Sequence, residues 1–340
     1  MRRARLTVAV TAAAALLLAA CGGGDEDGSS APEEKAAVKD LASQAALAAV
    51  WPLTGLPVKD GGSAIEEHPV YVVKIDNTPS SSPQVGLKTA DLVVEELVEG
   101  GSTRLAVFYY SKLPKEVGPV RSMRASDIGI VKPVAGELVT SGAATRTYGR
   151  LRDSKVTWHE EGAKGVYRNR GRRAPYNVFA DLTSLASGAK GSGERPDDYL
   201  EWGDSTDLPT GKPAKSIEAR FSGGHTSRWT YASGRYGLDG TFAAQGDEFK
   251  ADNVLVIRAT VGDAGYRDPA GNPVPETKFE GSGQGVLFHK GKAIQVTWHK
   301  SGLDGQLRLK TSQGGALKVP AGRTWIELVP TDQNAGVTFR

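Results

Sequence analysis

The chain has 340 residues, and its 42 lysines and arginines nearly balance 39 aspartates and glutamates, for a formal net charge of +3. A nucleic-acid-binding protein would show a basic stripe, so we expect no nucleic-acid partner. Cys21 is the only cysteine, which excludes intramolecular disulfides and thiolate zinc sites as sources of stability. The length is sufficient to bury the cores of two domains.

The first 21 residues predict a lipoprotein signal peptide and its attachment site. Three arginines within the first five residues precede an apolar stretch that is shorter than the ~20 residues of a membrane-spanning helix. The sequence LAAC, which ends at Cys21, resembles the bacterial lipobox. We therefore expect residues 1–20 to be a signal peptide and Cys21 to carry acyl chains, palmitate among them. This anchor would hold the protein on the extracytoplasmic face of the cell membrane. A secretory signal with a coincidental cysteine is the alternative.

Removal of the signal peptide would also change the charge of the protein. It takes away three arginines and no acidic residue, which leaves 39 basic residues against 39 acidic residues. The mature protein is therefore expected to be close to neutral.

Residues 21–50 are expected to form a flexible tether, because GGGDEDGSSAPEE is glycine-rich and acidic. The N-terminal domain is expected over residues 51–210. Its first clear strand covers residues 70–77, where VYVVKIDN is β-branched and apolar and ends in Asp76 and Asn77. We expect this strand to be buried and to lead into a loop.

The segment from residue 90 to residue 110 predicts a β-hairpin that turns at Gly100-Gly101, because glycine reaches positive φ without strain. A two-residue turn would place Glu95 opposite Ala106 and would create one polar face. Arg104 would lie diagonal to both glutamates of that face. The opposite face is apolar and is expected to pack on the core. The residues of the predicted polar face are Asp91, Glu95, Glu99 and Arg104.

The rest of the N-terminal domain predicts a helix over about residues 125–134 and a strand over residues 138–143. Residues 211–340 alternate strand-like runs with glycine turns and are expected to form a smaller, mostly antiparallel β domain. The predicted fold class is α+β, in which a mixed α/β domain precedes the β-rich one.

An ordered set of motifs resembles one known family. The motifs are PLTGLP, the Asp76-Asn77 pair, PQVGL with TADLVVEE, VEGGSTR, GPVRSMR and RAPYNVF, then DNVLVI, GSGQG, GKAIQVTWHK and GRTWIELVP. Their order is similar to that of the YerB-like bacterial lipoproteins, a two-domain family of unknown function, over about residues 51–330. The resemblance implies an architecture and an envelope location, but no reaction. The family usually has a histidine in place of Tyr176, and a tyrosine does not titrate near neutral pH.

The arginines in these motifs indicate an anion site, because a guanidinium can bind a carboxylate or phosphate through two parallel hydrogen bonds. Loops 118–124 and 171–177 would form such a pocket if they converge beside the predicted hairpin turn. The expected partner is a cell-wall component, such as a carboxylated glycan or peptide, or an envelope protein. An internal ion network is the alternative. The candidate residues are Asp76, Asn77, Glu95, Glu99, Arg104, Arg121, Ser122, Arg124, Arg173, Tyr176 and Asn177.

Two other function classes remain open. A wall-glycan hydrolase or transferase could use Glu95, Glu99 or Asp76 as acid or base. However, a four-residue spacing on a strand is about 13 Å, beyond the about 5–9.5 Å of paired glycosidase carboxylates. A scaffold for a protein partner would need a large apolar patch on the C-terminal domain. We favour a binding protein over an enzyme.

The remaining motifs do not predict a cofactor. No GxSxG elbow, dinucleotide fingerprint or Walker loop occurs, and GSGQG at residues 281–285 is expected to be a turn. His289 and His299 would lie too far apart on a hairpin turning at Lys290-Gly291 to share a metal. We therefore expect neither a cofactor nor a metal ion.

Overall fold

The computed structural model describes residues 47–332 and 334–340. The predicted signal peptide, the lipidation site Cys21 and most of the predicted tether lie outside these residues. Within the described part of the chain, no helix combines the length and the apolar character needed to cross a membrane.

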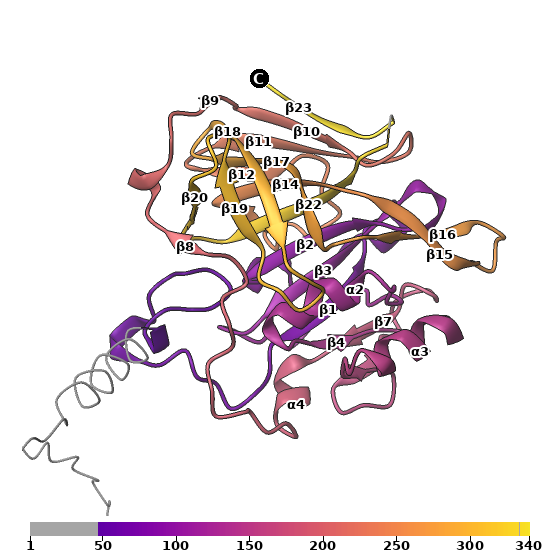
Figure 1. Cartoon of the computed structure of the whole chain (residues 1–340). Coiled ribbons are helices and arrows are strands. Elements are labelled where there is room, and N and C mark those ends of the chain that lie inside the picture. The colour runs from indigo at the N-terminus through magenta and orange to yellow at the C-terminus, as the bar shows by residue number, and fades with distance from the viewer. Residues whose placement is uncertain (1–46, 333) are drawn as a thin grey trace, which may run out of the picture. The chain divides into compact units, whose positions relative to one another are not determined.

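A twelve-stranded mixed sheet organises the described chain (Figure 1). In sheet order its strands are β20 (Ala316–Leu317), β19 (Arg308–Thr311), β18 (Lys292–Lys300), β17 (Gly281–His289), β14 (Asn253–Ala259), β22 (Thr324–Pro330), β2 (Leu92–Leu97), β3 (Thr103–Tyr109), β1 (Tyr71–Asp76), β4 (Glu137–Val139) and β5 (Trp158–His159), with β9 (Lys212–Pro213) beside β18. Strand β22 pairs in parallel with both β2 and β14, so strands from the two halves of the chain share this sheet.

Smaller sheets and short helices complete the fold. A five-stranded sheet contains β13 (Lys250–Ala251), β12 (Arg235–Leu238), β11 (Thr226–Ala232), β10 (Ser216–Arg220) and β23 (Gly336–Phe339). Three pairs are β15 (Val261–Arg267) with β16 (Pro273–Thr277), β21 (Val319–Pro320) with β8 (Trp202–Gly203), and β6 (Val166–Arg168) with β7 (Val178–Ala180). The α-helices are α2 (Asp127–Val131), α3 (Thr145–Asp153) and α4 (Leu182–Ala186). The 3-10 helices are η1 (Lys59–Gly61), η2 (Pro79–Ser81), η3 (Leu87–Thr89), η4 (Glu99–Gly101), η5 (Lys132–Val134) and η6 (Ser205–Asp207).

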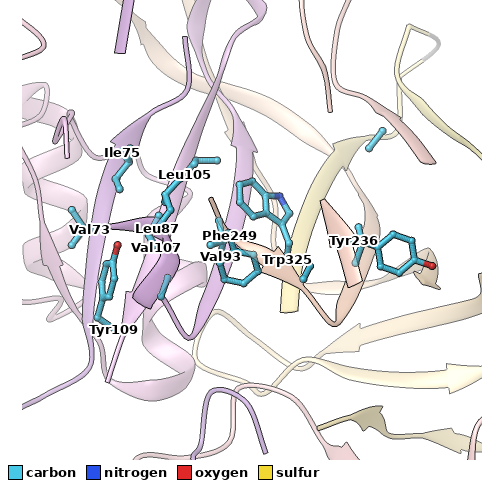
Figure 2. Packing of buried hydrophobic residues seen from close by; sticks show 14 of the residues in the cluster. Val73, Ile75, Leu87, Val93, Leu105, Val107, Tyr109, Tyr236, Phe249 and Trp325 are labelled. Carbon is cyan, nitrogen blue, oxygen red and sulfur yellow. The ribbon is translucent and has the colours of Figure 1, made fainter. Parts of the chain in front are cut away.

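The central strands of the large sheet are buried on both faces, which is why they are mostly apolar; these strands are β1, β2, β3, β14 and β22. On one face Val73, Val93 and Val107 pack in the cluster that also contains Phe249 and Trp325 (Figure 2). The five-stranded sheet covers this face, and the rings of Trp229 and Trp325 meet with centroids 5.1 Å apart. On the opposite face the buried cluster includes Val72, Val94 and Phe108, together with Ile128 of α2 and Tyr199.

The predicted hairpin is present, but the predicted register is wrong by one residue. Strands β2 and β3 pair with Glu95 opposite Leu105 and Glu96 opposite Arg104. The loop between these strands runs over residues 98–102 and contains η4. Gly100 and Gly101 both adopt positive φ there, at 70° and 72°, a conformation that glycine reaches without strain. Since side chains alternate across a strand, this slip removes Glu95 from the face that carries Arg104.

The other elements agree with the sequence in part. The α+β class with a β-rich C-terminal half is confirmed. The hairpin turning at Lys290-Gly291 is also confirmed, since β17 pairs with β18 from His289 opposite Lys292. GSGQG is not a turn but the beginning of β17. The predicted boundary near residue 210 falls between η6 and β9 and stays a prediction.

Candidate functional site

The turn between β2 and β3 holds one carboxylate between two arginines. Arg124 donates hydrogen bonds from Nε to Glu99 Oε2 at 2.9 Å and from Nη2 to Glu99 Oε1. Arg104 of β3 donates from Nη2 to Glu99 Oε1 at 3.1 Å. Arg104 and Arg124 are only 5% and 7% exposed. These three residues, which we term the closed cluster, form an internal ion network.

The loop backbone completes the closed cluster. The carbonyl oxygen of Ser122 accepts hydrogen bonds from Arg104 Nη1 at 2.7 Å and from Arg124 Nη1 at 3.3 Å. Asp127, at the start of α2, accepts the backbone N–H of Arg124 at 2.6 Å. The candidate residue Ser122 therefore contributes to this network through its main-chain carbonyl oxygen.

The closed cluster carries a surplus of positive charge, because two guanidinium groups face one carboxylate. Burial, reinforced by the charge of Arg124, lowers the pKa of Arg104 to about 10. Burial alone would raise the pKa of Glu99, but hydrogen bonds from Arg124 and the charges of both arginines outweigh it and lower that pKa. All three groups are therefore charged at neutral pH, and the carboxyl group of Asp127 also lies against Arg124.

Arg121 lies apart from the closed cluster and joins the two arginine-rich loops. Its Nε atom lies 3.1 Å from Asp76 Oδ2, and its Nη1 donates to the carbonyl oxygen of Pro175 at 3.1 Å. Its guanidinium carbon lies 4.9 Å from the centroid of the Tyr176 ring, which is a cation–π distance. Loops 118–124 and 171–177 therefore meet at this arginine.

A groove of about 650 Å³ lies between η2 and the second of these loops. Arg172 is fixed there, since its guanidinium donates to the carbonyl oxygens of Ser81 at 2.8 Å and Pro83 at 3.1 Å. Arg173 is exposed. The residues that line this arginine groove are Ser80, Ser82, Pro83, Gly171, Arg172, Arg173, Ala174, Pro175 and Tyr176.

Glu95 belongs to a third environment, on the opposite face of the sheet from Arg104. Its Oε1 accepts hydrogen bonds from Thr103 Oγ1 at 2.7 Å and from Asn77 Nδ2 at 3.0 Å, and lies 2.7 Å from His225 Nε2. Ser227 Oγ donates to Glu95 Oε2 at 3.0 Å. The structure thus separates Glu95 from Glu99, and it places neither beside Asp76, which pairs with Arg121.

The candidate residues therefore divide into three groups. Glu99, Arg104 and Arg124 form the closed cluster, which Ser122 completes. Arg173 and Tyr176 line the arginine groove, which Arg121 and its partner Asp76 reach through Pro175 and Tyr176. Glu95 and Asn77 form the third group. Asn177 accepts a hydrogen bond from Arg168 at 2.9 Å and does not line the groove. Among residues 47–332 and 334–340, no group of three histidine, aspartate, glutamate or cysteine side chains is placed to hold a metal ion.

Sequence reasoning missed the three partners of Glu95 that come from the C-terminal half, which are Ser227, Glu327 and His225. Glu327 of β22 lies directly opposite Glu95 in the parallel pairing with β2, and neither side chain is exposed. His225 is half-buried beside them. A glutamate in the centre of the apolar run TWIELVP was the available signal, because an acid within a buried strand needs a partner.

Two family models match this chain. The N-terminal domain of the family described as "Protein of unknown function (DUF3048)" matches residues 53–195, and the C-terminal domain of the same family matches residues 217–326. The chain belongs to the DUF3048 family. The arginine groove and the closed cluster lie in the N-terminal match, whereas His225 lies in the C-terminal match, and Glu327 follows it immediately.

Comparison with individual proteins also connects the chain to YerB. The chain is 25% identical over 332 residues to "Putative lipoprotein YerB" of Bacillus subtilis (strain 168), which covers 90% of this chain and 92% of that protein. The crystal structure of the YerB protein from Bacillus subtilis matches with a TM-score of 0.69 and 22% identity. That match covers 85% of this chain and 99% of the YerB chain, so the two proteins share a fold.

Proposed function

We propose that this protein is a membrane-anchored lipoprotein that binds an anionic cell-envelope ligand in the arginine groove. The observation that carries the proposal is the exposed Arg173 beside Tyr176, whose ring is held by Arg121. An exposed guanidinium can form two parallel hydrogen bonds with a carboxylate. The tyrosine ring offers a surface on which a sugar ring or a peptide group can pack.

The anchor supports the envelope location. The sequence LAAC ends at Cys21, the only cysteine, and the relative from Bacillus subtilis carries the word lipoprotein in its name. Replacement of Cys21 by serine should move the protein from the membrane fraction to the soluble fraction. Unchanged membrane retention in a detergent-free fractionation would contradict lipidation at this residue.

The closed cluster is not expected to contact the ligand, because its arginines are buried and satisfied by Glu99 and do not line the groove. We therefore assign direct binding to Arg173 and Tyr176, with Arg121 as the residue that positions the ring.

A thermal-shift titration tests the groove. The chain from Gly22 onward would be titrated with wall fragments that carry free stem-peptide carboxylates, and with the same fragments after amidation. Arg173→Ala should weaken binding of the acidic fragments about 10- to 100-fold, because a hydrogen bond to a charged group contributes about 1.5–3 kcal/mol. Its Tm without ligand should stay near the wild-type value.

Arg170→Ala is the matched control, since Arg170 is an exposed arginine of the same segment that does not line the groove. It should bind as the wild type does. Equal binding of acidic and amidated fragments, or equal losses in the Arg170 and Arg173 variants, would contradict a carboxylate site at Arg173.

The two rival functions have less support. Glu95 lies opposite Glu327, and Glu96 shares Lys74 with Asp127, but all four of these acidic residues are 0% exposed, so a glycan has no access to them. The exposed large apolar side chains of the described residues are Leu47, Leu56, Ile65 and Tyr167. All four precede residue 210, so they provide no apolar docking patch on the C-terminal half.

A further inference from the structure

A cluster of three titratable side chains joins the two family segments. Glu95 of β2 and Glu327 of β22 lie directly opposite each other on parallel strands, and both are fully buried. His225, just before β11, places Nε2 at 2.7 Å from Glu95 Oε1. These contacts connect segments that are 130 residues apart in the sequence.

The two carboxyl groups share one proton. Two like charges at adjacent positions in a water-free environment cannot both be ionised. Burial, and then the charge of Glu95, raise the pKa of Glu327 well above its usual range. Glu327 therefore keeps its proton and donates a hydrogen bond to Glu95, while it accepts one from Trp229 Nε1 at 2.7 Å.

Glu95 is the ionised member of the pair. Burial by itself would raise its pKa, but the hydrogen bond and the charge of His225 outweigh burial and lower that pKa. The hydroxyl groups of Thr103 and Ser227 and the amide of Asn77 also donate to it. A carboxylate with this many donors is strongly stabilised in its charged form.

His225 is the member that can exchange its proton with solvent, because its side chain is 18% exposed. The charged or titratable groups that face it are Glu95 from β2 and, behind it, Glu327 from β22. The neighbours from β3 and β11 are Thr103 and Ser227, which do not titrate. With His225 protonated, Glu95 ionised and Glu327 neutral, the cluster has no net charge.

The same histidine belongs to a turn that docks on η4. Ser222 Oγ donates to the carbonyl oxygen of Gly101 at 2.6 Å, and the His225 ring contacts Thr103 Oγ1 at 3.1 Å. The backbone N–H of His225 in turn donates to Ser222 Oγ at 3.1 Å. The turn over residues 222–225 is thus held against η4 by the Ser222 contact and by the His225–Glu95 pair.

We propose that His225, Glu95 and Glu327 form a proton-operated latch, which clamps the turn at residues 222–225 against η4 while His225 is protonated and releases it when His225 loses its proton. The latch goes beyond the proposed ligand binding and does not depend on it. Loss of the proton removes the positive partner of Glu95, and a buried carboxylate without that partner is costly.

The direction of the pH dependence follows from the three groups. Burial lowers the pKa of His225, but Glu95 outweighs burial and raises it above the ordinary 6.5, so the stability from this group is lost as pH rises through the raised value. Glu327 acts in the same direction, because its pKa is also raised. Glu95 acts oppositely, since its pKa lies below the ordinary 4.5 and its contribution is lost as pH falls through that lower value. The contributions of His225 and Glu95 are therefore both complete between about pH 4.5 and about pH 6.5, whereas the contribution of Glu327 already declines as pH rises above about 4.5.

Hydrogen exchange of the chain from Gly22 onward tests the latch. After correction for the intrinsic pH dependence of exchange, the amides of residues 99–103 and 222–227 should lose at least about tenfold of their protection between about pH 5.5 and about pH 8.5. In His225→Gln the side chain can still donate to Glu95 but cannot titrate, so this change in protection should disappear. A wild-type pH profile in His225→Gln, or a flat profile in the wild type, would overturn the latch.

Two further variants keep the test decisive. His159→Gln is the matched control, because His159 forms another histidine–glutamate pair with Glu137 at the edge of the sheet, and it should leave the profile unchanged. Glu327→Gln imitates the protonated carboxyl group. It should raise the urea midpoint at about pH 8.5 relative to the wild type and leave it nearly unchanged at about pH 4. A variant less stable than the wild type at both pH values would contradict the neutral state of Glu327.

Discussion

Glu95 and Glu96 are neighbours on β2, and neither is exposed, yet they lie on opposite faces of the sheet in two different charge environments. Glu96 Oε1 accepts a hydrogen bond from Lys74 Nζ at 2.7 Å, and the same Nζ lies 2.8 Å from Asp127 Oδ1. Glu95 instead faces His225, hydroxyl groups and the neutral carboxyl group of Glu327. Each carboxyl group contacts a basic side chain, but only Glu95 contacts a histidine, whose ordinary pKa lies near neutral pH.

The comparison shows how the partner decides whether a buried charge is permanent. Burial lowers the pKa of Lys74, but Asp127 and Glu96 outweigh burial and raise it, so the lysine keeps its proton over the whole neutral range. The ordinary pKa of histidine is 6.5, close to neutral, and Glu95 outweighs burial and raises the pKa of His225 above that value. The Lys74 cluster therefore fixes α2 against β1 permanently, while the His225 cluster is able to switch.

The largest effect is expected from Lys74→Met. This variant removes the cation between Glu96 and Asp127, and breaking a buried pair in this way costs about 3–5 kcal/mol in the free energy of unfolding. Since both acids should then bind protons on folding, the loss should be smaller in acid than at neutral pH. Urea unfolding at several pH values measures both effects.

Lys88→Met is the control for this prediction, because Lys88 is exposed and its replacement should change stability by less than about 0.5 kcal/mol. If Lys74→Met lowered the free energy of unfolding by less than about 1 kcal/mol at neutral pH, Lys74 would not be the permanently charged partner that distinguishes Glu96 from Glu95.

The strands around this site could be predicted from the sequence, but the side-chain partners could not. The runs at residues 70–77 and 90–110 are β-branched and apolar, and they form β1, β2 and β3. The register failed because Gly100-Gly101 belongs to a five-residue loop in which the Val98 N–H donates to the Ser102 carbonyl oxygen at 2.8 Å, instead of closing a two-residue turn. Because side chains alternate across a strand, an error of one residue in the predicted pairing of β2 with β3 assigned Glu95 to the face that carries Arg104, whereas it lies on the other face.

The contact between Glu95 and Glu327 was not predicted from the sequence either, for a different physical reason. Glu95 meets Glu327 only because β22 pairs in parallel with β2, and parallel pairing between distant segments leaves no local signal in the sequence. From the sequence, the meeting of the two arginine-rich loops was only a condition for an anion pocket, because guanidinium chemistry does not select which loops come together. The path of loop 118–124 determines that Arg124 pairs with Glu99 while Arg121 reaches Pro175. This path is fixed in part by the Arg121 N–H, which donates to the Lys74 carbonyl oxygen at 2.8 Å.

A smaller effect is expected from Ser227→Ala, which acts on Glu95 without touching the Lys74 cluster. The variant removes the donor to Glu95 Oε2 but leaves His225, Thr103 and Asn77 on Oε1, so stability should fall by about 1.5–3 kcal/mol at neutral pH. Loss of a hydrogen bond to the ionised form also raises the pKa of Glu95 in the folded state. Its contribution to stability is lost as pH falls through that pKa, so acid unfolding should begin at a higher pH than in the wild type. Ser312→Ala, at an exposed serine, should shift neither the urea midpoint nor the acid transition. If Ser227→Ala lowered stability equally at every pH, Glu95 would not be the ionised member of its pair, and the contrast with Glu96 would rest on packing alone.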